Sequence, residues 1–481
     1  MRIKMPEYKW QIFSVTGLAN ITTTIAMSSI NLALPIIADE FLISMSAVSW
    51  LSIVYYLIPS CTLLIFGRAA DIFGYKRQFI GGFLLFGLSA LLLSLLARGM
   101  ASLLIFRSFQ ALGYSMMISI TQAMCNRTFP ENERGRALGI NAVFVSVGLA
   151  IGPSIGGFLI FRFGWRSIFL FNAPFCILGV LASLMILKKD IPQQGSAQRM
   201  DWLGSFFFAI FIGLSVFAIN FSAEWGAASV RFVGCMIVSL SSLLLFIIRQ
   251  SRTDVPLMNL VFFRNPTFSL SNGAIFCSYF IQQMNTFLMP FFLMNILLLA
   301  SGRAGFVMLA SPIAMMLLSP IGGRLTDSFG SRKPALTGLT VLATACVIMS
   351  TMSQATPVFV VLLGLFLFGA GNGMSVVAIN SAIFSAVPKT DSGIASGMVA
   401  TMRNLGQTIG VACAGAIMAL RRSHYTGRAP VGPESADGSI IYLMAQRDVY
   451  YFGVFIIAIA IICVFMIRSG KPGVRIKGDL Q

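Results

Sequence analysis

Long apolar stretches alternate with short polar connections along nearly the whole chain of 481 residues. A bilayer core of about 30 Å needs roughly 20 apolar residues per helical span. At that length, the pattern predicts about fourteen membrane-spanning helices. The predicted spans lie at residues 10–35, 46–67, 78–97, 100–124, 136–161, 164–188, 202–221, 229–249, 266–292, 303–325, 334–353, 356–384, 393–420 and 449–468.

The composition agrees with an all-α integral membrane protein. Hydrophobic residues make up 57% of the chain and charged residues only 10%, and the mean hydropathy is +0.85. The eight cysteines lie in separate apolar segments without any CxxC or Cys/His spacing, so we expect no metal site and no bound cofactor. The absence of embedded acid, His and Cys clusters also argues against an enzyme.

The basic residues are distributed unevenly across the predicted topology. The net charge of +18 would suggest nucleic acid in a soluble protein. Here, 23 of the 34 Lys and Arg residues, including all nine lysines, fall on the side of the membrane that holds the N-terminus. This bias predicts that both termini are cytoplasmic and that basic turns contact anionic lipids, with no nucleic-acid partner.

One short sequence occurs twice. GRAADIFGYKR (Gly67–Arg77) returns as GRLTDSFGSRK (Gly323–Lys333), at an offset of 256 residues and after the second and the tenth predicted spans. A shared turn at the same place in two halves predicts duplicated bundles. The residues expected to support conformational gating in these turns are Gly67, Asp71, Gly74, Arg77, Gly323, Asp327 and Gly330, with the aspartates as helix caps or as partners of nearby arginines.

Six spans per half would need only about 200 residues, so the larger offset predicts two added helices between the halves. Polar linkers precede and follow the added pair. The predicted organisation is a six-helix bundle (10–188), two linker helices with their connections (189–264), a second six-helix bundle (265–468) and a cytoplasmic tail (469–481).

Several further motifs carry a family resemblance. They are RSFQALG from Arg107, GLAIGPSIGG from Gly148, WRSIFLFNAP from Trp165, DWLG from Asp201 and RNLGQTIG from Arg403. Together with the repeated turn, they resemble the major facilitator superfamily, and within it the fourteen-span drug:proton antiporters of the multidrug efflux type. The resemblance implies the major facilitator fold, alternating access by two rocking bundles, efflux of amphipathic compounds, a bacterial cytoplasmic membrane and a monomeric protein.

The first span departs from that family in one respect. Many of these antiporters carry Leu-Asp-x-Thr-Ile-Val-Asn-Val-Ala-Leu-Pro here, whereas this chain reads TTTIAMSSINLALP, with Ala26 at the place of the Asp. None of the sixteen acidic residues falls in the middle third of a predicted span, and the only histidine, His424, falls in a predicted loop. Proton coupling through a buried carboxylate is therefore not expected, and Asp39, at the rim of span one, is the remaining coupling candidate.

Two arginines lie inside predicted spans. An arginine inside the membrane costs free energy unless it pairs with another group or is hydrated. Arg107 and Arg403 are therefore either neutralised by backbone carbonyls or exposed to a substrate cavity. Without an acid partner, such a cavity would prefer anions. The substrate-binding candidates are Arg107, Gln110 and Tyr114 in span four, Thr24, Ser28 and Asn31 in span one, Tyr279, Gln283 and Thr286 in span nine, and Arg403 and Gln407 in span thirteen.

Span five contains Gly152, Pro153, Gly156 and Gly157, which we interpret as a pivot between the halves, with plain helix packing as the alternative. The sequence as a whole predicts a secondary transporter of amphipathic small molecules, an exporter that favours organic anions or zwitterions. Two alternatives stay open: a proton-coupled multidrug cation pump that uses a rim acid, and a flippase for lipids or lipid-linked substrates. A channel would need a pore-loop filter, and no filter sequence is visible.

Overall fold

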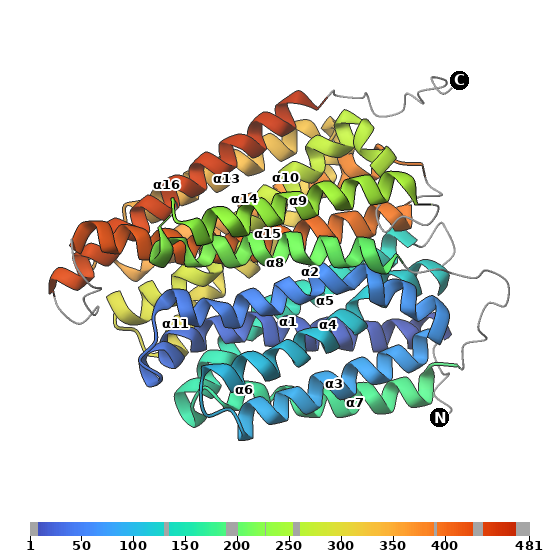
Figure 1. Cartoon of the computed structure of the whole chain (residues 1–481), viewed down its shortest axis with the longest axis horizontal. Helices are drawn as coiled ribbons and strands as arrows, with labels where there is room; N and C mark the ends of the chain where they lie inside the picture. The colour runs from blue at the N-terminus through green and yellow to red at the C-terminus, as the bar shows by residue number, and fades with distance from the viewer. Residues whose placement is uncertain are drawn as a thin grey trace.

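The computed structural model describes residues 8–128, 134–188, 201–226, 228–253, 260–388, 392–426 and 436–467, which fold into helices without any strand. Long helices run side by side along the long axis of the molecule (Figure 1). The elements are α1 (Tyr8–Glu40), α2 (Met45–Phe73), α3 (Tyr75–Leu95), α4 (Met100–Thr128), α5 (Arg134–Phe163), α6 (Ser167–Leu170), α7 (Asn172–Ile186), α8 (Trp202–Trp225), α9 (Val230–Arg252), the 3₁₀ helix η1 (Leu260–Arg264), α10 (Pro266–Phe291), the π-helical turn η2 (Phe292–Ile296), α11 (Ser301–Met308), α12 (Ala310–Phe329), α13 (Arg332–Ser350), α14 (Val358–Ser385), α15 (Ser392–Thr426) and α16 (Ala436–Met466).

Every predicted span coincides with a helix or a pair of consecutive helices. Within the described residues, twelve helical segments are long and apolar enough to cross a membrane, so the protein is a multi-pass membrane protein. The helices α10 and α15 are equally long but are not among these twelve. The count of fourteen spans therefore stays a prediction.

The same helix pairings occur in both halves. In the first half α1 packs on α5, α2 on α4, α3 on α4 and α3 on α7. In the second half the corresponding pairs are α10 with α15, α12 with α14, α13 with α14 and α13 with α16. Two sequence segments thus build one bundle design twice, as the repeated turn predicts.

Glycines bring equivalent helices into close contact in each half. A Cβ on Gly82 of α3 would lie 3.2 Å from the carbonyl oxygen of Gly113 in α4. A Cβ on Gly338 of α13 would lie 2.8 Å from the carbonyl oxygen of Gly371 in α14. A larger residue at either place would push two backbones apart, which explains why small residues occupy these positions.

The added helices α8 and α9 form a hairpin beside both bundles. The helix α8 packs on α2 of the first half and on α15 of the second, and α9 packs on α8. Asp201 closes the hairpin, because its buried carboxylate accepts hydrogen bonds from Gly204 N at 3.0 Å, Arg249 Nε at 3.1 Å and Gln250 Nε2 at 2.8 Å. This cluster gives the DWLG motif a structural explanation.

Replacing Asp201 by Ala is expected to lower the free energy of unfolding by about 2 kcal/mol, because it removes a helix cap and the hydrogen bond from Gln250 to the carboxylate. Thermal unfolding of the purified protein measures the loss. Ser229→Ala is the matched control, because Ser229 caps α9 through one bond, from Phe232 N at 3.2 Å. Equal losses in the two variants would refute a special role for the Asp201 cluster.

Both copies of the repeated turn reverse the chain at a glycine with a positive φ. Gly74 ends α2 with φ 97° and Gly330 ends α12 with φ 77°, conformations that residues with a Cβ rarely adopt. Of the two basic residues that end each turn, the first contacts the last helix of its own half. Lys76 Nζ donates to the carbonyl of Leu184 in α7 and to that of Leu187, which directly follows α7, and Arg332 lies over the Phe465 ring of α16 at 4.5 Å.

The remaining gating candidates of the turns are placed as follows. Gly67 and Gly323 are half-buried near the ends of α2 and α12. Asp327 is exposed in the last turn of α12 and does not cap α13, which begins without a side-chain cap, so the expectation of a cap is wrong there. The side chain of Asp71 lies outside the described residues.

The last two helices extend beyond their predicted bounds. His424 lies in the last turn of α15 and Asp448 lies inside α16, so their predicted placement in a loop is wrong. Asp448 is mostly buried, accepts a hydrogen bond from Tyr425 Oη at 2.7 Å and pairs with Arg421 Nε at 3.2 Å. These partners compensate the charge of Asp448 in the first half of α16. Hydropathy alone does not distinguish this polar part of the helix from a loop.

Candidate functional site

Arg107 of α4 is buried inside the first half, with a residual exposure of 1%. Its guanidinium donates to Gln110 Oε1 at 2.5 Å and to the carbonyl oxygens of Leu51 and Ala26, both at 3.4 Å. It lies over the Tyr55 ring at 4.0 Å. No carboxylate of the described residues pairs with it. At Ala26, where the family resemblance places an aspartate, a backbone carbonyl contacts the cation instead.

Tyrosine rings connect this arginine with the second half. Tyr55 of α2 stacks on Tyr114 of α4, with centroids 5.1 Å apart and an interplanar angle of 14°. Tyr114 lies within electrostatic range of Arg403 in α15 and Tyr279 in α10. The Arg403 guanidinium lies 6.0 Å from the centroid of the Tyr279 ring. We call Tyr55, Tyr114 and Tyr279 the tyrosine bridge, and it lies between Arg107 and Arg403.

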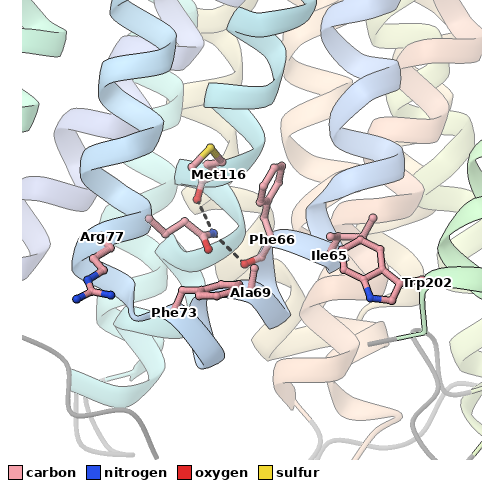
Figure 2. Close-up of a pocket in the computed structure, with 8 residues that line it drawn as sticks. Ile65, Phe66, Ala69, Phe73, Arg77, Met116 and Trp202 are labelled. Carbon is pink, nitrogen blue, oxygen red and sulfur yellow. Dashed lines mark hydrogen bonds between the residues drawn. The ribbon is translucent and has the colours of Figure 1, made fainter. Parts of the chain in front are cut away.

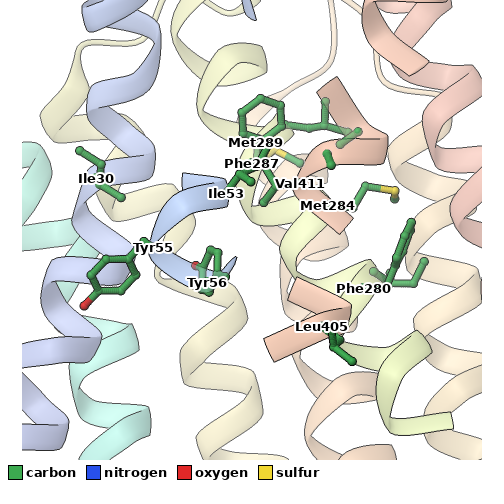
Figure 3. Close-up of a cluster of buried hydrophobic side chains, with 14 of the residues drawn as sticks. Ile30, Ile53, Tyr55, Tyr56, Phe280, Met284, Phe287, Met289, Leu405 and Val411 are labelled. Carbon is green, nitrogen blue, oxygen red and sulfur yellow. The ribbon is translucent and has the colours of Figure 1, made fainter. Parts of the chain in front are cut away.

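The ring of the neighbouring Tyr56 projects from a different side of α2 than the Tyr55 ring, as Figure 3 shows. Its ring meets the Tyr55 ring edge-on, with centroids 6.0 Å apart, and its hydroxyl lies near the Gln283 side chain of α10. Gln283 thus lies beside the first half. Residues Tyr114, Tyr279, Gln283 and Arg403, predicted from the sequence as substrate contacts, are brought together where the halves meet.

Buried amide groups near this bridge lack hydrogen-bond partners in the described part of the chain. They are Nε2 of Gln110, Nε2 of Gln283, and both side-chain polar atoms of Asn404. An unsatisfied buried polar group costs about 1–3 kcal/mol, so such groups are retained where a ligand or water completes them. Asn404 is absent from the sequence prediction, although it directly follows Arg403 in the RNLGQTIG motif.

The polar face of α1 is directed at α5. A Cβ on Gly148 would lie 2.8 Å from Thr24 Cβ, and a Cβ on Gly152 would collide with Ser28 Oγ. Ser28 Oγ already donates to the Thr24 carbonyl at 2.9 Å. The placement of Thr24 and Ser28 favours helix packing over ligand binding, and it accounts for the hydroxyl-rich sequence of the first span.

Three further residues were predicted as substrate contacts, and two of them have hydrogen-bond partners within the protein. Asn31 is fully buried, accepts from Ser52 Oγ at 3.2 Å and so joins α1 to α2. Thr286 is half-buried and donates to the Gln282 carbonyl at 2.8 Å. Gln407 is 6% exposed on α15, one turn beyond Arg403.

The coupling candidate Asp39 lies far from this centre, exposed at the end of α1. Next to it, Glu40 accepts hydrogen bonds from Trp165 Nε1 at 2.5 Å and from Arg166 Nη1 at 3.0 Å. The WRSIFLFNAP motif therefore fastens the end of α1 to α6. We call the end of the bundle where α1 begins the terminal end and the opposite end, with Glu40, the far end.

The glycines of α5 face two different neighbours. Gly152 and Gly156 pack on α1 of their own half. Pro153 and Gly157 pack on α11 of the other half, where Ser301 Oγ donates to the Gly157 carbonyl at 3.3 Å. In addition, Asn220 of the added helix α8 donates to Ser49 of α2 at 3.1 Å and so joins α8 to the first half. These contacts lie towards the far end.

Gly305→Ala is expected to slow transport by about tenfold or more, because the added methyl group would collide with the Pro153 carbonyl oxygen and separate α11 from α5. Gly302→Ala is the matched control, since its nearest neighbours would lie 4.0 Å away. Initial rates in proteoliposomes compare the two. A Gly305→Ala variant as active as the control would contradict the role of this contact.

The comparisons with known proteins show the family and the fold of this chain. The family model of the Major Facilitator Superfamily matches residues 16–263 and 271–478. The chain belongs to the Major Facilitator Superfamily. It is a transporter, and the resistance proteins among its relatives support the predicted multidrug efflux family.

Three relatives and one structure illustrate this similarity. Riboflavin transporter RibZ of Clostridioides difficile is 31% identical over 84% of this chain and 87% of its own length. Multidrug resistance protein Stp of Mycobacterium tuberculosis is 29% identical over 84% and 75%, and lincomycin resistance protein LmrB of Listeria monocytogenes is 26% identical over 92% and 93%. A bacterial homologue of the human lysosomal transporter Spinster has the same fold, with a TM-score of 0.66, 17% identity and coverage of 96% and 97%.

Proposed function

We propose that this superfamily member exports amphipathic small molecules, with a preference for organic anions and zwitterions. One observation carries the proposal: two arginines flank the tyrosine bridge, and no carboxylate of the described residues pairs with either. Charges in a low-dielectric interior interact strongly, so an unbalanced positive layer attracts an anionic group and repels a cation.

We propose Arg403, rather than Arg107, as the group that meets the substrate. Arg403 is only partly buried and lies where α4, α10 and α15 approach each other. Arg107 is held behind the Tyr55 ring by hydrogen bonds to Gln110 and two backbone carbonyls. It supports the bridge and adds to the positive potential without touching the ligand.

The tyrosine bridge favours a substrate with an aromatic ring. Tyrosine faces bind flat rings, and the unpartnered amides of Gln283 and Asn404 offer donors and acceptors to a polar edge. The relative named as a riboflavin transporter makes riboflavin a reasonable probe for this class. The relatives named as resistance proteins support export as the direction.

We propose that the terminal end faces the cytoplasm, because the basic residues gather at that end. The contact between α5 and α11 at the far end then supports a state closed to the outside. Rocking of the bundles would break this contact and open the far end. No central carboxylate takes part, and Asp39 at the rim is the proposed acid if protons drive the cycle.

Transport by purified protein in proteoliposomes tests the proposal. An imposed membrane potential or pH gradient should drive an aromatic sulfonate across the bilayer, and a concentration gradient of riboflavin, which is uncharged at neutral pH, tests the preference for an aromatic ring. A fluorescent phospholipid, followed in the same vesicles, covers the flippase alternative. Movement of the phospholipid without movement of any soluble probe would overturn the proposed function.

A further inference from the structure

A pocket of about 480 Å³ lies at the terminal end, where α2, α3 and α4 meet the first residue of α8. Figure 2 shows Arg77 and Trp202 at its two ends, with side chains of α2 between them. Among the described residues, the apolar lining consists of Ile65, Phe66, Ala69, Phe73, Met116 and Trp202, and the polar lining consists of Arg77 and Gln78.

Gln78 builds the pocket, because its side-chain amide nitrogen donates to groups of the protein. Its Nε2 donates to the carbonyls of Phe66 at 2.8 Å and Met116 at 3.1 Å, and to Ser119 Oγ at 3.1 Å. These bonds join α2, α3 and α4 at the height of the pocket. Arg77 is therefore the group that a bound molecule would meet electrostatically.

Arg77 is exposed and makes no hydrogen bond or ion pair with the described residues. Phe73 and Trp202 beside it are each 64% exposed. One unpaired cation at the edge of an apolar wall matches a molecule with an anionic head and an apolar chain. Tryptophan is also the residue that prefers the boundary between lipid headgroups and acyl chains.

The two basic residues that end the first copy of the turn differ in their contacts. Lys76 Nζ is bound to the carbonyls at the end of α7, whereas Arg77 has no hydrogen-bond partner among the described residues. In the second copy Arg332 lies over the Phe465 ring, and Lys333, the counterpart of Arg77, is exposed. Lys333 therefore provides a matched control for Arg77.

We propose that this pocket binds one anionic phospholipid. Its phosphate pairs with Arg77, and an acyl chain lies along Ile65, Phe73 and Trp202. The lipid connects the first bundle to the added helix α8, since α2 and α8 both line the pocket. Occupancy thereby couples the anionic lipid content of the membrane to the position of α8 at the terminal end. The proposal is independent of the identity of the transported substrate.

Native mass spectrometry of the purified protein, titrated with phosphatidylglycerol or phosphatidylcholine, tests the proposal. The wild type should bind the first phosphatidylglycerol more tightly than phosphatidylcholine. Arg77→Gln should weaken phosphatidylglycerol binding by about fivefold, the usual contribution of one basic residue near an anionic surface. Lys333→Gln should leave it unchanged, and Trp202→Ala should weaken binding of both lipids.

Each other outcome contradicts the proposal in a defined way. An equal loss of phosphatidylglycerol affinity in Arg77→Gln and Lys333→Gln would mean that the lipid is attracted non-specifically by the positive charge of both turns. Unchanged binding in Arg77→Gln would exclude the phosphate contact, and unchanged binding in Trp202→Ala would exclude the apolar wall. Melting temperatures of the variants show whether a loss of binding reflects unfolding.

Discussion

Replacing Ala26 by Asp is expected to weaken the preference of the transporter for anions. The Ala26 carbonyl oxygen lies 3.4 Å from the Arg107 guanidinium, so a carboxylate at this residue has its counter-ion within reach. The pair would cancel one of the two central positive charges. In a partly buried setting such a charge change amounts to several kcal/mol. The ratio of cation to anion flux should rise by about tenfold or more.

Ala26→Asn controls for this substitution, because it introduces the same shape without the charge. Both variants disturb packing at a residue that is 2% exposed, so both should lose some activity. Only the Asp variant should change the ratio of the two fluxes. A ratio that changes equally in both variants, or in neither, would show that charge at this position does not select the substrate.

Arg403→Gln is expected to lower the flux of an anionic probe by at least about tenfold and to leave that of a cationic probe unchanged. Glutamine keeps a hydrogen-bond donor beside Tyr279 and removes the charge. Loss of one charge-assisted contact costs about 1.5–3 kcal/mol, which corresponds to a tenfold or larger change. Initial rates in proteoliposomes measure both fluxes.

Arg421→Gln serves as the control on the same helix. Arg421 also belongs to α15, but it is 49% exposed and pairs with Asp448. Its loss should not change the preference between the two probes. Loss of anion flux in both variants would attribute the effect to the overall charge of α15, and an Arg403→Gln variant with full anion flux would exclude Arg403 as the contact.

The duplicated bundles and part of the centre could be predicted from the sequence because both depend on local signals. The repeated turn needs only its own glycines and basic residues, and it indicates where equivalent helices begin. Polar side chains within apolar spans cost free energy, so they are expected to have a functional role. This argument predicted Tyr114, Tyr279, Gln283 and Arg403. Their meeting at the interface follows from the two bundles facing each other.

The direction of a side chain within a bundle could not be predicted in this way. Arg107 and Arg403 both stand out in the sequence as arginines within apolar spans. Arg107 nevertheless points into its own half, because its N–H groups donate hydrogen bonds to the carbonyl oxygens of Ala26 and Leu51. Ser28 is directed at Gly152, which no helical spacing of α1 alone reveals. The role of Tyr55 was missed because nothing in its local sequence distinguishes it from other aromatic residues in apolar spans.

Flux of two matched probes in wild-type proteoliposomes tests the central claim most directly. The probes share one aromatic fluorophore and differ only in a carboxylate or a trimethylammonium group, and they are offered together under imposed potentials of either sign. An unbalanced positive layer predicts faster transport of the carboxylate under both potentials. Faster transport of the ammonium probe, driven by a pH gradient, would contradict the account and assign coupling to a rim acid such as Asp39.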